Sequence, residues 1–273
     1  MRLRRVFIGV VVAAFPLAFI VAPPSQAQAA DDLSKLAKMV PGVKKAKLKA
    51  SVKYLAKKRH TSYGKELKAI IASINKQVAY NKKRRDIAGA MSVKGFTGQG
   101  GVTSARSAKW TGDIFVSTLG SQAGGINFGH TGIYVAKDEV LHAPGIGKKA
   151  LRQSIRTVQV GVGTVYMTTP LSIARQISVV DYAKPTYESQ KYNYMYYTNK
   201  VRDGLTVRMP LVGPGIKVNL NPADRTNCSE LVWGAYKRKG GIDLDGYTAG
   251  NGDALAVFPW DIERSSLTTS YAG

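Results

Sequence analysis

The sequence predicts an α+β fold in which a basic helical segment precedes a mixed domain of short strands and helices. Residues 31–88 contain 17 Lys and Arg against four acids, and their apolar residues recur at spacings of three and four, as in amphipathic helices. From Trp110 onward, short β-branched runs alternate with turns rich in Gly and Asp. With 273 residues and 44% hydrophobic residues, the chain can form a packed core.

The first 29 residues are typical of a secretory signal peptide. A basic start (residues 1–5) precedes an apolar run (6–22), and Ala27-Gln28-Ala29 matches the small-x-small cleavage pattern. An uncleaved anchor is the alternative, but the run is short for a membrane span and contains Pro16. Cleavage lowers the formal charge from +23 to +20, because residues 1–29 carry three arginines and no acid. Export makes nucleic acid a poor partner and favours anionic wall polymer or anionic membrane lipid.

Residues 30–88 are expected to form two or three basic amphipathic helices, interrupted near Pro41-Gly42 and near Ser62-Tyr63-Gly64. His60 lies among cations there and is expected at the surface. This arm is either a helical pro-segment or solvated spacer, or a polyanion-binding segment. Residues 89–107, rich in Gly, Ser, Thr and Ala, are predicted to be a linker.

The remaining chain, residues 108–273, is predicted to be one domain. Strands are expected at 114–116, 131–135, 139–141 and 162–167, where β-branched and aromatic residues cluster between turns.

The chain has one cysteine, Cys228, and therefore no internal disulfide. In an exported protein such a cysteine is either a buried apolar filler or a reactive thiol. Asn227 is a good helix N-cap, Glu230 completes an Asn version of the capping box, and Gly240-Gly241 ends the helix. Cys228 is then the first helical residue, where the helix dipole and unpaired N–H groups favour a thiolate. This position favours a nucleophile over a filler.

Two histidines could supply the base. His130 opens one strand-like run and His142 ends the next, twelve residues later, so a hairpin places both on one face. A turn centred near Ala136 would set them opposite each other, and a turn nearer Asp138 would offset them along the strands. Two purely structural histidines are the alternative. We expect no cofactor and no metal, because one cysteine and two histidines without a fourth ligand make a poor zinc site.

Three runs resemble the NlpC family of papain-like cell-wall hydrolases: WTGDIFV at 110–116, HTGIYV at 130–135 and VLHAPG at 140–145. In that family the nucleophilic cysteine precedes these strands. Here the only cysteine follows them, in NCSELVW at 227–233, an order that resembles the circularly permuted branch of the superfamily. The resemblance covers roughly residues 108–267.

The resemblance implies a circularly permuted papain-like domain, with an antiparallel sheet packed against the helix that carries Cys228. It also implies that Cys228 is the nucleophile, His130 the base and His142 the orienting third residue. The expected activity is that of a secreted cysteine hydrolase, associated with the cell wall or the membrane surface, that cleaves an amide bond in peptidoglycan peptide stems. Two alternatives remain, namely a lipid acyl hydrolase or acyltransferase at the membrane surface, and a non-catalytic cell-surface binding protein.

Overall fold

The computed structural model describes residues 26–40, 43–91, 101–120, 122–123, 126–194, 206–209, 216–219, 224–245 and 256–271. Most of the predicted signal peptide, residues 1–25, lies outside these ranges, and residues 26–29 begin the first helix. Among the described residues, no helix combines the length and the apolar character needed to cross a bilayer.

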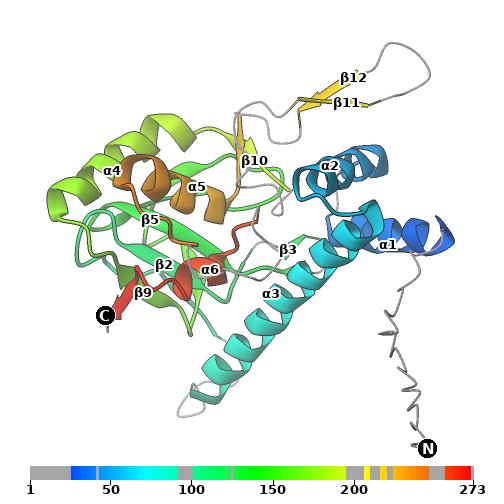
Figure 1. Ribbon diagram of the computed structural model, residues 1–273. Helices are drawn as coiled ribbons and strands as arrows, with labels where there is room; N and C mark the ends of the chain where they lie inside the picture. Colours follow the sequence, from blue (N-terminus) through cyan, green and yellow to red (C-terminus); the bar gives the residue numbers. More distant parts are fainter. Residues whose placement is uncertain are drawn as a thin grey trace, which may run out of the picture.

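Three helices form the basic arm, as predicted: α1 (Gln26–Met39), α2 (Lys45–Lys58) and α3 (Tyr63–Met91) (Figure 1). The second interruption lies slightly earlier than predicted, because Tyr63 and Gly64 begin α3 instead of preceding it. His60 is exposed, as expected, and has a positive φ of 50° in the connection. The helices bury their apolar faces against one another, through Leu36, Val40, Leu48, Val52, Leu55, Leu67, Ile70 and Ile74.

A six-stranded antiparallel sheet forms the centre of the second unit, in the order β14-β9-β2-β5-β6-β7. Its strands are β2 (Ile114–Ser117), β5 (His130–Ala136), β6 (Glu139–His142), β7 (Leu151–Ser154), β9 (Val165–Thr168) and β14 (Thr269–Tyr271). The predicted strands at 114–116, 131–135 and 139–141 are confirmed. The predicted strand at 162–167 is wrong in its first half. Thr164 hydrogen-bonds back to the carbonyl of Gly161 through both its N–H and its hydroxyl, and this turn separates β9 from β8 (Gln159–Gly161).

Short strand pairs surround the main sheet. β1 (Val102–Ser104) pairs with β8, β3 (Gln122–Ala123) with β4 (Ile126–Asn127), and β11 (Thr206–Met209) with β12 (Ile216–Asn219). β10 (Lys191–Tyr192) and β13 (Arg225–Thr226) form a parallel pair. Because α3 continues to Met91 and β1 starts at Val102, regular structure occupies both ends of the predicted linker 89–107, while residues 92–100 lie outside the described ranges.

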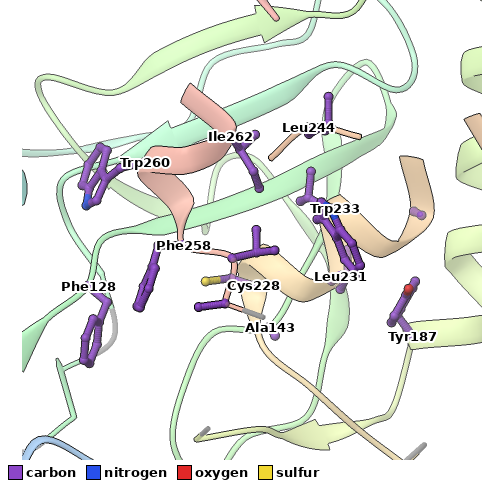
Figure 2. Packing of buried hydrophobic residues seen from close by; sticks show 14 of the residues in the cluster. Phe128, Ala143, Tyr187, Cys228, Leu231, Trp233, Leu244, Phe258, Trp260 and Ile262 are labelled. Carbon is purple, nitrogen blue, oxygen red and sulfur yellow. The ribbon is translucent and has the colours of Figure 1, made fainter. Parts of the chain in front are cut away.

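Helices cover one face of the main sheet. They are α4 (Ile173–Tyr187), α5 (Cys228–Ala235), which continues as a π-helix (Tyr236–Gly240), and α6 (Pro259–Glu263). One apolar cluster joins these helices to the sheet residues Ile114, Ile133 and Leu141 and also includes the buried residues of the arm. Figure 2 shows part of this cluster around α5 and α6. The opposite sheet face forms a second cluster around Phe115, Tyr134, Val140 and Tyr166. The predicted α+β class, with an antiparallel sheet against the helix that carries Cys228, is confirmed at this level.

The arm packs directly on the second unit. The Nε2 of Gln77 in α3, itself 1% exposed, donates to Oδ1 of Asp261 in α6 at 3.0 Å. Arg264 bonds the same carboxylate at 2.7 Å and lies 4.8 Å from the ring centroid of Tyr80. The ring of Tyr80 in turn contacts Trp260, at 5.5 Å between centroids. These contacts show a docked helical unit instead of a solvated spacer.

Candidate active site

The start of α5 is built as the sequence predicts. Asn227 has extended backbone angles, and its side-chain oxygen accepts a hydrogen bond from the N–H of Glu230 at 3.0 Å. Cys228 is therefore the first helical residue, and its N–H belongs to the first turn, which has no partner within the helix. The carboxylate of Glu230 accepts from Nδ2 of Asn193 at 3.2 Å. Gly241, with φ 75°, caps the far end.

Cys228 is completely buried. Figure 2 shows its sulfur among the apolar side chains of the helix-facing cluster, near Phe258 and Ala143. The hydroxyl of Ser229 donates to the carbonyl of Val257 at 2.7 Å, and Phe258 stacks on Phe128 with centroids 6.0 Å apart. The first turn of α5 is therefore tied to the segment that leads into β5. Complete burial is compatible with Cys228 as a packing residue and with Cys228 as a nucleophile. The polar groups near it therefore have to distinguish the two roles.

The two histidines are in direct contact, with Nε2 of His130 2.7 Å from Nδ1 of His142. Residues 137 and 138 form the turn, and His142 pairs across the strands with Gly132 instead of with His130. Of the two predicted arrangements, the offset one is confirmed. The imidazole contact runs diagonally across Gly132, where an added Cβ would lie 2.7 Å from the ring of Phe115 and 3.0 Å from the Cβ of His142.

A third polar side chain extends the pair. Oε1 of Gln153 in β7 lies 2.9 Å from Nε2 of His142. Strand pairing explains this contact, because Gln153 pairs with Val140, two residues from His142 on the same face. Sequence reasoning missed Gln153, since it lies in a stretch without family resemblance and only the register of β7 on β6 brings it to the site.

Burial keeps both rings neutral near neutral pH. It lowers the pKa of His130 well below the ordinary value of 6.5, and the neighbouring His142 lowers it further. Burial also lowers the pKa of His142; the hydrogen bond to Gln153 partly offsets this, and Lys148 adds to the lowering. Nδ1 of His130 is buried and, within the described ranges, has no hydrogen-bond partner.

The structure brings His130 and His142 into direct contact, and Cys228 lies in the buried apolar cluster beneath α5. The His130 ring packs against Phe115, at 5.5 Å between centroids, and Phe115 belongs to the second apolar cluster. Cys228 belongs to the cluster on the α5 side, and α5 packs on β5 itself. Both groups thus lie at the same strand, and the unpartnered Nδ1 is the nitrogen left to meet a thiol or a substrate.

Among the residues that the structure describes, no three His, Cys, Asp or Glu side chains are grouped so that they could hold a metal ion.

The outer surface of the arm is strongly cationic. Of its acids, Glu66 is buried and bonded to Arg59 at 3.0 Å, Asp32 is 6% exposed and 3.5 Å from Lys35, and Asp31 is exposed. Among the described residues of the arm, exposed lysines therefore far outnumber the exposed acid on the outer surface, which we call the cationic arm surface and define by these lysines: Lys35, Lys38, Lys44, Lys45, Lys49, Lys53, Lys57, Lys65, Lys68, Lys76, Lys82 and Lys83.

Comparison with known protein families finds no match. The chain is 24% identical over 252 residues to "Uncharacterized protein YycO" of Bacillus subtilis (strain 168), covering 92% of this chain and 89% of that protein. It also resembles the crystal structure of the metalloprotein yiiX from Escherichia coli O157:H7, DUF1105, with 15% identity over 62% of this chain and 98% of that one. The TM-score of 0.30 is too low to show a shared fold.

Proposed function

We propose that this chain is an exported cysteine hydrolase with a circularly permuted, papain-like (NlpC-like) domain, which cleaves an amide bond with Cys228, His130 and His142. One observation carries the proposal. The histidine pair is joined at 2.7 Å and leaves Nδ1 of His130 buried without a partner, on the strand against which the cysteine helix packs. A buried neutral imidazole with one nitrogen anchored and the other unoccupied is suited to accept a proton.

The reaction begins with transfer of the Cys228 thiol proton to Nδ1 of His130. The thiolate attacks the carbonyl carbon of the substrate amide and forms a tetrahedral adduct. As the carbon–nitrogen bond breaks, the His130 imidazolium protonates the departing amine, and a thioester remains on Cys228. Water then attacks the thioester while His130 accepts its proton, which releases the carboxylic acid and restores the thiol.

Two features of the fold support these steps. The N–H of Cys228, at the start of α5, is a donor for the oxyanion of the adduct. Nδ1 of His142 lies 2.7 Å from Nε2 of His130, and by accepting a hydrogen bond from it would hold the ring while its charge changes.

Peptide stems of peptidoglycan are the substrate we favour. Support comes from the predicted signal peptide and from the cationic arm surface, which suits anionic wall polymer next to peptidoglycan. A lipid acyl hydrolase or acyltransferase is the second candidate. Ile173 and Ile177 are 58% and 42% exposed, one turn apart on α4, and could contact a membrane.

The test is mass spectrometry of muropeptides and of anionic phospholipids after incubation with the mature protein, with Cys228→Ala as control. Cleaved stem peptides that are absent with Cys228→Ala support the proposal. Released fatty acid with intact muropeptides would select the lipid reaction. Products that persist with Cys228→Ala would contradict the cysteine mechanism. No product from any substrate, despite binding to cell walls, would point to the non-catalytic binding protein.

A further inference from the structure

We propose that Gln153, held by Thr157, is a positioning residue that sets the direction of the hydrogen bonds through the histidine pair and so leaves Nδ1 of His130 as the proton acceptor. The geometric part of this inference needs no activity, whereas its catalytic consequence rests on the proposed function.

The donor and acceptor in each hydrogen bond are fixed at Thr157, the end of the hydrogen-bond chain most remote from His130. The backbone carbonyls there can only accept. The Thr157 hydroxyl donates to the carbonyl of Ser154 at 2.9 Å. Its oxygen is then left to accept, and Nε2 of Gln153 donates to it at 3.0 Å. The same Nε2 lies 3.3 Å from the carbonyl of Thr157. Because two acceptors surround Nε2, only one orientation of the Gln153 amide satisfies these hydrogen bonds. In that orientation Oε1 faces His142.

The orientation of the Gln153 amide fixes the donor and the acceptor in the next two hydrogen bonds. Oε1 of Gln153 can only accept, so Nε2 of His142, 2.9 Å away, carries the proton. The other nitrogen of a neutral His142 is then an acceptor and receives Nε2–H of His130 at 2.7 Å. A neutral His130 with its proton on Nε2 has a lone pair on Nδ1, the buried nitrogen without a described partner.

The opposite direction is disfavoured for a geometric reason. If His142 donated from Nδ1, its Nε2 would be an acceptor and Gln153 would have to turn its NH₂ group toward it. Oε1 of Gln153 would then face two oxygens near Thr157, the carbonyl and a hydroxyl already committed to Ser154. Facing acceptors repel, so Gln153 decides whether Nδ1 of His130 has a lone pair or carries the proton.

The direct test is two-bond 1H–15N correlation spectroscopy of the histidine side chains in the full-length mature protein near neutral pH. For the wild type, we expect His130 and His142 both protonated on Nε2. Gln153→Leu removes the acceptor and should produce mixed or reversed tautomers. Gln153→Glu keeps an acceptor oxygen and should retain the protonation of Nε2 on His142. Arg152→Gln, the neighbouring position on β7, is the matched control and should leave both tautomers unchanged.

Thr157→Val is a second variant that tests the inference if the Gln153→Leu protein does not fold. It removes only the side-chain acceptor of the amide and should give a smaller tautomer change. The inference is overturned if neither Gln153→Leu nor Thr157→Val alters the histidine tautomers, or if wild-type His142 carries its proton on Nδ1.

Turnover separates this inference from the proposed function. If the protein hydrolyses a substrate, loss of Gln153 should lower kcat by about 10- to 100-fold, with Gln153→Glu retaining more activity than Gln153→Leu. Equal turnover of wild type and Gln153→Leu would overturn the positioning role. If no substrate is cleaved but the tautomers shift as expected, the geometric inference stands and the hydrolase proposal fails.

Discussion

Replacing Gly132 by alanine is expected to destabilise the protein and to separate the paired histidines. The new Cβ would lie 2.7 Å from a ring carbon of Phe115 and 3.0 Å from the Cβ of His142. The ring of Phe115 is fully buried and wedged between Tyr134 and His130, with centroid distances of 6.3 and 5.5 Å. Neither neighbour can yield without disturbing the imidazole contact.

The magnitude follows from two opposing effects. Removing a glycine from a strand interior stabilises the fold by roughly 0.5–1 kcal/mol, because the unfolded chain loses freedom. Overpacking a buried site costs about 1–3 kcal/mol, and here the clash involves a rigid ring at 2.7 Å. We therefore expect a net loss of roughly 1 kcal/mol, which lowers Tm by about 2–4 °C for a chain of this size.

The assay combines thermal unfolding with the histidine side-chain spectra described above. Gly147→Ala is the control, because its Cβ would meet nothing within 4 Å. That variant should lose stability through its φ of 76° alone and leave the histidine signals unchanged. Combining Gly132→Ala with Phe115→Leu should cost less than the sum of the two single changes, since the smaller side chain makes room. An unchanged or higher Tm for Gly132→Ala, with an intact histidine pair, would refute the steric reasoning.

Four further outcomes are expected. Cys228→Ala should lower turnover by about 10³-fold or more and cost about 1 kcal/mol of stability, as measured by product formation and thermal unfolding. His130→Ala should be nearly inactive, and His142→Ala should lose about 10- to 100-fold, with part recovered in His142→Asn or His142→Gln, whose amide oxygen still accepts. The free energy of unfolding should fall as the pH drops below about 6.5, because the depressed pKa values of His130 and His142 mean that the unfolded chain binds protons the folded chain does not. Lys49→Glu with Lys53→Glu should weaken binding to anionic cell walls by roughly tenfold at low salt, measured by co-sedimentation.

The controls for these outcomes are specific. Circular dichroism should show folded protein for every histidine and cysteine variant. Wild-type activity of His142→Ala beside inactive His130→Ala would show that His142 is structural. A denaturation midpoint independent of pH between 5 and 7 would contradict the burial of neutral rings. Lys137→Glu, a charge reversal at an exposed lysine outside the arm, should bind as the wild type does, and salt-insensitive binding would argue against electrostatic attachment.

The arm shows how far a helical pattern can be interpreted. Its three helices follow from apolar residues spaced at three and four, which depend only on the geometry of each helix. Whether the arm is solvated or docked depends on α6, about 180 residues away, where Asp261 accepts a hydrogen bond from the side chain of Gln77. No local pattern indicates that contact, because glutamine in an amphipathic helix usually faces water.

The sequence alone determined features that rest on neighbouring residues. Asn227 caps α5 because its side chain accepts from the N–H of Glu230, three positions later. Cys228 is therefore the first residue of the helix. A spacing of twelve places His130 and His142 on one face because side chains alternate along strands. Tertiary structure decided the rest: the offset register across Gly132, the position of Gln153, the complete burial of Cys228 and the docking of the arm. Each of these depends on how elements far apart in the chain pack together, and packing is decided by shape and volume that a linear pattern does not contain.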